Sequence, residues 1–126
     1  MTEKGILITN NSDIIKLNSE KIKVIFYEDL SGLDVLKKAR DFIHKGHILL
    51  THPLHSSLKP NETPYRTVMI GSEKKSSVDI DSLLLIEKAL ESYQKFMKNG
   101  NVPEMSSKMK KDFRLIDFDL IKHAVT

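Results

Sequence analysis

The order of apolar runs in the first half of the chain constrains the fold most. Gly5–Thr9 and Ile22–Tyr27 are rich in β-branched and aromatic residues and end at polar residues, as buried strands do. A helix should follow, with Ser31 as its N-cap and Gly46 as its left-handed stop. The apolar run His47–Thr51 comes immediately after. Strand, helix and strand with short joints are typical of a parallel α/β unit.

The rest of the chain continues this pattern. Only one or two helical turns fit between the first two strands, and Asp13–Leu17 can supply them. Tyr65–Ile70 predicts a fourth strand, and a long apolar stripe after Asp79 or Asp81 predicts a second helix. Two shorter helices should follow, one with Pro103 in its first turn and one capped by Asp117.

These elements predict one α/β domain over residues 1–126, with a mostly parallel sheet of about four strands and helices on both faces. We expect the strand order 2-1-3-4. Alternatively, the fourth strand pairs antiparallel with the third, and the connection between them becomes a wide hairpin. A length of 126 residues agrees with one domain.

Composition excludes several function classes. The chain has no cysteine, so it has no disulfide, thiolate metal site, iron–sulfur cluster or thiol nucleophile. A net charge of +3 is too small to indicate nucleic-acid binding by itself, and the basic C-terminal third is interpreted as a solvated helix face. There is no apolar stretch long enough for a membrane span or a signal peptide, so we expect a cytoplasmic protein without membrane partners.

The segment from Thr51 to Arg66 is the candidate site. It contains three of the four prolines, and a connection of this length without regular structure is typically functional or disordered. It begins where a parallel strand should end, at the edge where open α/β sheets bind ligands. Its lysine, arginine, hydroxyl and amide groups suit a small carboxylate or phosphate. The predicted ligand-binding residues are His52, Ser57, Lys59, Asn61, Glu62, Tyr65 and Arg66, converging near Asn10 and Asn11. The alternative is that this segment only covers a sheet edge.

Other chemistries have weaker support. His52 and His55 are three residues apart, but a proline-containing loop does not fix their geometry, and no second group of ligands accompanies them. We therefore predict neither a metal nor another cofactor. No Gly-x-Ser-x-Gly elbow surrounds Ser56, and no glycine-rich phosphate loop is present, so we assign no catalytic residue.

Two segments carry a family resemblance. Arg40-Asp-Phe-Ile-His-Lys-Gly-His-Ile-Leu-Leu-Thr-His-Pro-Leu and Ser57-Leu-Lys-Pro-Asn-Glu-Thr-Pro-Tyr resemble the GrdX family, and the similarity extends over nearly the whole chain. These proteins are encoded beside glycine, sarcosine and betaine reductase genes of amino-acid-fermenting anaerobes. The family pattern has small residues at positions 55 and 56, which speaks against a shared role for His55.

The resemblance implies an accessory role in that reductase system, through assembly or regulation by protein contact. The system itself uses selenocysteine and cysteine chemistry, which a chain without cysteine cannot carry. The alternative is a binding protein or enzyme for a small carboxylate or phosphate, with residues 51–66 as its site. The residues leave open whether the protein is an enzyme.

A homodimer is also expected. Leu84, Leu85 and Phe96 widen the apolar stripe of the second long helix beyond the row that covers the sheet. The C-terminal helices or a second subunit could cover this excess, and two-fold dimers are the commonest assembly.

Overall fold

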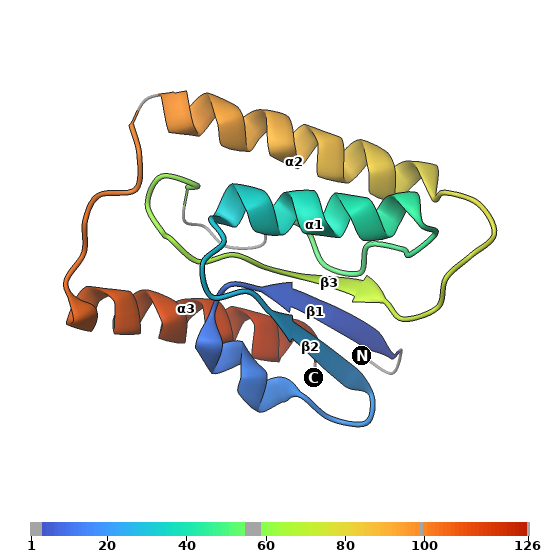
Figure 1. Cartoon of the computed structure of the whole chain (residues 1–126), viewed down its shortest axis with the longest axis horizontal. Helices are drawn as coiled ribbons and strands as arrows, with labels where there is room; N and C mark the ends of the chain where they lie inside the picture. Colours follow the sequence, from blue (N-terminus) through green and yellow to red (C-terminus); the bar gives the residue numbers. More distant parts are fainter. Residues whose placement is uncertain (1–3, 55–58, 99, 126) are drawn as a thin grey trace.

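A computed structural model describes residues 4–54, 59–98 and 100–125 (Figure 1). The elements follow in the order β1 (Gly5–Thr9), η1 (Ser12–Leu17), β2 (Ile22–Phe26), α1 (Gly32–His44), β3 (Thr67–Gly71), α2 (Ile80–Lys98) and α3 (Ser107–Val125). The chain is therefore an α/β domain, as predicted, and the short 3-10 helix η1 makes the first crossover.

The sheet has three strands in the order β2-β1-β3. β1 pairs parallel with β2, with Leu7 opposite Val24, and antiparallel with β3, with Leu7 opposite Met69. The prediction of a mostly parallel sheet of about four strands was therefore wrong: the sheet is mixed and smaller. The run predicted as the fourth strand occupies the place beside β1 that was expected for the third.

Residues 47–51, predicted as the third strand, do not form one. Leu49 makes a single antiparallel bridge to Ile70, and the N–H groups of Leu50 and Thr51 both donate to the carbonyl oxygen of Met69, at 2.9 and 3.3 Å. The Thr51 hydroxyl accepts from the Met69 N–H at 2.9 Å, so a side chain takes the place of a backbone partner. The segment covers the outer edge of β3, and its bridge agrees with the antiparallel alternative.

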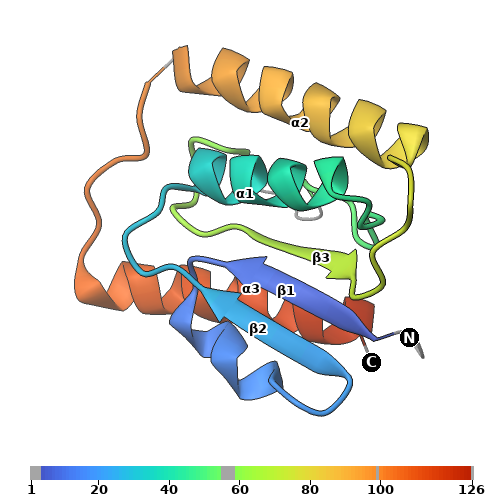
Figure 2. The same ribbon diagram turned by 45° about the vertical axis from the view of Figure 1, so that its right-hand side comes forward.

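Helix α1 begins and ends where the sequence predicts. The Ser31 hydroxyl accepts from the Asp34 N–H at 3.2 Å, and Gly46 has a φ of 108°, which favours glycine. Its apolar face packs on the sheet, and α2 lies along the outer side of α1 (Figure 2). A buried cluster joins these layers, and it includes Ile8, Val35, Leu36, Ala39, Ile43, Val68, Ile70, Ile86 and Leu90.

Helices cover the other face of the sheet as well, as predicted. Helices η1 and α3 lie there, around a second core of Leu7, Ile14, Met69, Ile121 and Val125 (Figure 1). The two short C-terminal helices were a wrong prediction, because α3 is continuous. Asp117 does not cap a helix; it lies within α3 with its buried carboxylate against Asn11 and Thr67. No helix in the described residues is long and apolar enough to cross a membrane.

Candidate functional site

Asn10 organises the carboxyl end of β1. Its side-chain amide donates to the carbonyl oxygens of Leu30 and Pro64, at 2.8 and 2.9 Å, and its Oδ1 accepts from the Arg66 N–H at 2.9 Å. Asn10 thus joins the β2–α1 connection to the segment that leads into β3. The proximity of Arg66 to Asn10 was predicted, but the side chain of Asn10 is used in holding the backbone together.

Arg66 is the most unusual side chain of this region. It is 1% exposed, and its Nε and Nη2 have no hydrogen-bond partner. Its guanidinium carbon lies 5.6 Å from the centre of the Tyr93 ring. None of the ion pairs in the described part of the chain involves it. A buried cation without a neighbouring anion raises the free energy of the folded state, so a negative charge close to Arg66 would stabilise this arrangement.

A groove of about 600 Å³ opens at the carboxyl ends of β1 and β2. The β2–α1 connection, the first turn of α1, the end of α2 and the α2–α3 connection line it, together with Thr63 and Pro64. We call it the α1–α2 groove. It lies where ligands bind in open α/β sheets.

Gly32 and Tyr93 form the part of the groove that lies over Arg66. The Tyr93 hydroxyl occupies the space that a Cβ on Gly32 would fill, and the Arg66 Cβ lies 3.4 Å from the same point. Burial raises the pKa of Tyr93, and the positive charge of Arg66 and a hydrogen bond with the Arg66 side chain oppose that rise. Tyr93 is therefore a neutral hydroxyl, able to donate a hydrogen bond, at physiological pH.

The first turn of α1 adds two donors. The Ser31 hydroxyl and carbonyl accept from the N–H groups of Asp34 and Val35. The N–H groups of Gly32 and Leu33 have no acceptor among the described residues, and both residues line the groove. Free N–H groups and the positive end of the helix dipole favour an anion here.

Two other predicted site residues face the opposite layer. The Tyr65 hydroxyl accepts from Nη1 of Arg114 at 2.9 Å. The Asn11 side chain donates to the Arg114 carbonyl oxygen and to Oδ2 of Asp117, both at 2.9 Å. Both residues therefore attach α3 to the sheet.

The remaining predicted residues do not gather around Arg66. His52 is exposed and accepts from the Leu54 N–H, while Glu62 accepts from the Lys59 N–H at 2.7 Å, tying this part of the loop to itself. Asn61 has a buried Oδ1 without a partner. Ser57 lies outside the described residues, as do His55 and Ser56.

The family model for GrdX-like proteins matches residues 6–126, almost the whole chain. The chain belongs to the GrdX-like family. No curated protein and no solved structure shows significant similarity to it.

None of the predicted site residues that the structure describes lines the groove of this GrdX-like chain, and Gly32 and Tyr93, which do line it, were not among those predicted. In the sequence, Tyr93 belongs to the apolar stripe that predicts the second long helix, and Gly32 directly follows the predicted N-cap Ser31. One signal was available, because tyrosine is the one member of that stripe with a polar tip that needs a partner when buried. The side of α1 on which Arg66 lies could not be obtained from sequence spacing.

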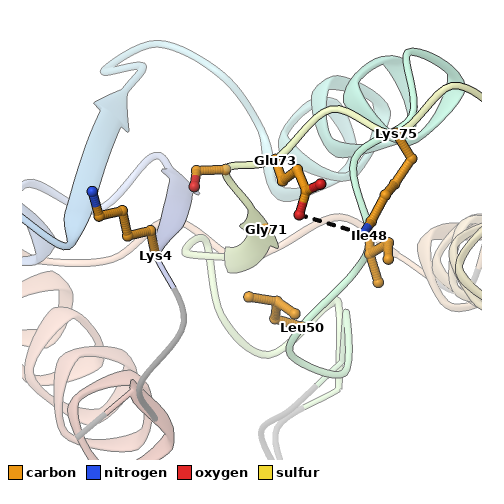
Figure 3. A pocket seen from close by; sticks show the side chains of 7 residues that line it. Lys4, Ile48, Leu50, Gly71, Glu73 and Lys75 are labelled. Atoms are coloured by element: carbon orange, nitrogen blue, oxygen red, sulfur yellow. Dashed lines mark ion pairs between the residues drawn. The ribbon is translucent and has the colours of Figure 1, made fainter.

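A second pocket, of about 310 Å³, lies at the other end of the sheet (Figure 3). Glu73 and Lys75 point toward each other there and form an ion pair at 3.3 Å, while Lys4 lies apart from them (Figure 3). These charged groups are exposed. We therefore favour the α1–α2 groove, where the unpartnered charge is buried.

The metal prediction was negative and stays a prediction. Among the described residues, no group of three or more histidine, aspartate or glutamate side chains could hold a metal ion.

Proposed function

We propose that this GrdX-like protein binds a small carboxylate or phosphate anion in the α1–α2 groove. The buried guanidinium of Arg66, whose Nε and Nη2 have no hydrogen-bond partner, is the observation that carries this proposal. Leaving one charge buried without its partner costs about 3–5 kcal/mol. A chain that retains such a group gains that free energy back when an anion binds nearby.

Two kinds of interaction would hold the anion: direct hydrogen bonds from groove residues, and electrostatic attraction by the buried charge of Arg66. The N–H groups of Gly32 and Leu33 and the hydroxyl of Tyr93 are the donors that can touch the anion. Arg66 lies beneath them and acts through its charge, which is screened less in a buried site than at the surface. The 51–66 segment contributes Thr63 and Pro64 to the lining of the groove, whereas Lys59 and Glu62 do not line it. Arg66 is buried behind Gly32 and Tyr93 and does not line the groove itself.

A thermal-shift screen tests this function. Acetate, propionate, inorganic phosphate and acetyl phosphate are the probes, and an anion at 100 times its Kd adds about 2.7 kcal/mol to the free energy of unfolding. We expect Arg66→Met to abolish the shift and Arg66→Lys to keep part of it. Arg40→Met is the matched control, because Arg40 is a surface arginine that pairs with Glu87 at 3.4 Å.

Two results would count against an anion site. One is a wild-type protein that responds to none of the probes. The other is an equal loss of response in the Arg40 and Arg66 variants, because that would indicate a general effect of charge rather than the groove.

We also propose an accessory role in the reductase system that the GrdX resemblance implies, through protein contact. Exposed apolar side chains on α3 favour this second function, because such groups on a helix surface are typical of contact sites. They are Met109, Leu115, Ile116 and Leu120. A pull-down from a glycine-fermenting culture should recover a reductase component with the wild type and less of it with Ile116→Lys. Recovery of none would count heavily against the role.

A homodimer remains part of this proposal. Ile80 and Leu84 on α2 are 62% and 63% exposed, so the outer side of α2 has apolar surface that a second copy could cover. Light scattering should give twice the 14.4 kDa of one chain. A mass of one chain at working concentration would exclude the dimer.

A further inference from the structure

The rim of the α1–α2 groove has the opposite charge to Arg66, which is buried behind the groove residues Gly32 and Tyr93. Glu28 and Asp29 follow β2 directly and line the same groove as Gly32 and Tyr93. Both carboxylates are exposed, and neither takes part in an ion pair within the described part of the chain. These residues stand five and four positions before Leu33, so the negative rim adjoins the positive start of α1.

We infer that the ligand of this groove is a zwitterion of the α-amino acid type, with an apolar side chain. This inference rests on the proposed anion site and narrows it. The carboxylate of the ligand would meet the free N–H groups of Gly32 and Leu33 over Arg66. Its ammonium group would meet the carboxylates of Glu28 and Asp29.

The charge pattern separates this ligand from a simple anion. A phosphate dianion on the Gly32 and Leu33 amides would be repelled by the two carboxylates at the rim. A ligand with its own cation next to its anion turns that repulsion into attraction. Arg66 supplies the compensating positive charge from below, 1% exposed and with two unpartnered nitrogens, so the amide donors are not the only feature that indicates an anion.

The rest of the lining indicates the side chain of the ligand. Leu30, Leu33, Met97 and Val102 line the groove, and its volume of about 600 Å³ exceeds what a carboxylate and an ammonium group need. An apolar substituent would remove these side chains from water, which stabilises the complex in proportion to the area buried. A polar substituent would gain less from them.

A set of three probes with one carbon skeleton tests the zwitterion. L-Leucine carries both charges, 4-methylpentanoate lacks the amine, and 3-methylbutylamine lacks the carboxylate. Isothermal titration of the wild type should give a Kd for leucine that is about three- to fivefold lower than that for 4-methylpentanoate, and no binding of the amine. Amide NMR shifts of Gly32 and Leu33 on adding leucine would locate the site.

Substitutions of the charged residues test which of them interacts with the ammonium group of the ligand and which with its carboxylate. In Glu28→Gln/Asp29→Asn, the advantage of leucine over 4-methylpentanoate should disappear while both still bind. In Arg66→Met, both should lose binding, and the control Glu73→Gln, at the other end of the sheet, should leave all three probes unchanged. Equal or tighter wild-type binding of 4-methylpentanoate would overturn the zwitterion and keep the anion site. Binding of neither acid would overturn both.

Discussion

Two buried charged side chains lie on opposite faces of the sheet, and only one of them has its hydrogen bonds made. Oδ2 of Asp117 accepts from Nδ2 of Asn11 at 2.9 Å and from the Thr67 hydroxyl at 2.7 Å. Arg66, the neighbour of Thr67 in sequence, has two buried nitrogens without a partner. A satisfied buried charge specifies the fold, whereas an unsatisfied one indicates a function that is completed by something else.

On the face of the sheet that α3 covers, the bond to Asp117 also determines which threonine hydroxyl donates and which accepts. Since Asp117 accepts from the Thr67 hydroxyl, that hydroxyl must accept from Thr9, 2.7 Å away, and Thr9 in turn accepts from the Asn11 N–H at 2.9 Å. The chain of bonds holds β1, β3 and α3 in one register. Among the described residues, no such chain of hydrogen bonds surrounds the Arg66 guanidinium on the other face.

Replacing Asp117 should have the largest effect. Asp117→Ala leaves the donors of Asn11 and Thr67 without an acceptor, so we expect the free energy of unfolding to fall by about 3 kcal/mol. Urea denaturation measures this loss. Asp112→Ala, an exposed change on the same helix, should stay within about 0.5 kcal/mol of the wild type. Equal losses in both variants would remove the distinction between the two faces.

Replacing Arg66 should act in the opposite direction. Arg66→Met removes an uncompensated buried charge and keeps an apolar chain of similar length, so the ligand-free protein should gain about 1–3 kcal/mol. The same denaturation experiment gives the sign, with Arg40→Met as the surface control. A marked loss of stability would show that Arg66 stabilises the fold, as Asp117 does.

Gly32 tests the packing over Arg66. In Gly32→Ala the new methyl group meets the Tyr93 hydroxyl and lies 2.9 Å from the ring carbon Cζ, which should cost about 1–2 kcal/mol. Gly71→Ala is the matched control, because its nearest atom, the Ile48 carbonyl oxygen, is 3.7 Å away. Combining Gly32→Ala with Tyr93→Leu should recover part of the loss, and a purely additive double variant would disprove the contact.

Asp79 extends the comparison to a carboxylate at the surface and should give the smallest effect. Hydrogen bonds from the Ser82 hydroxyl and then from the Ser82 N–H lower the pKa of Asp79 below its ordinary value of 3.8. A lowered pKa in the folded state means that the stabilisation is present above the unfolded value and is lost as the pH falls through the folded one. The stability difference between the wild type and Asp79→Asn should therefore vanish in acid; a difference that does not change with pH would contradict this.

Local signals were enough to predict the elements with clear ends. Ser31 and Gly46 delimit α1 through a side-chain cap and a backbone angle, both of which depend on neighbouring residues only. The failure at residues 47–51 has a tertiary cause, because the Thr51 hydroxyl replaces a backbone partner of Met69. Asp117 likewise looked like a cap, since its partners Asn11 and Thr67 are 106 and 50 residues away in the chain.

The candidate site was predictable only in part. Arg66 was expected near Asn10, and its backbone N–H does meet the Asn10 side chain. The reason differs from the predicted one, because Arg66 directly precedes β3, which runs antiparallel to β1. Tyr93 comes from a helix whose position over α1 depends on packing between distant segments. Glu28 and Asp29 follow the strand that pairs in parallel with β1, so their place at this edge can be derived from the sequence.

The cover on β3 has a consequence for self-association. An open strand edge invites a strand from another molecule, and such additions lead to aggregates. Residues 48–51 occupy the outer edge of β3, and at β2 the Asn18 and Ser19 side chains accept from the N–H groups of Val24 and Ile22, at 3.0 and 3.2 Å. With an exposed lysine, Lys23, as the second residue of the five-residue β2, neither border is a ready template for a foreign strand, so copies of this chain would meet through helices.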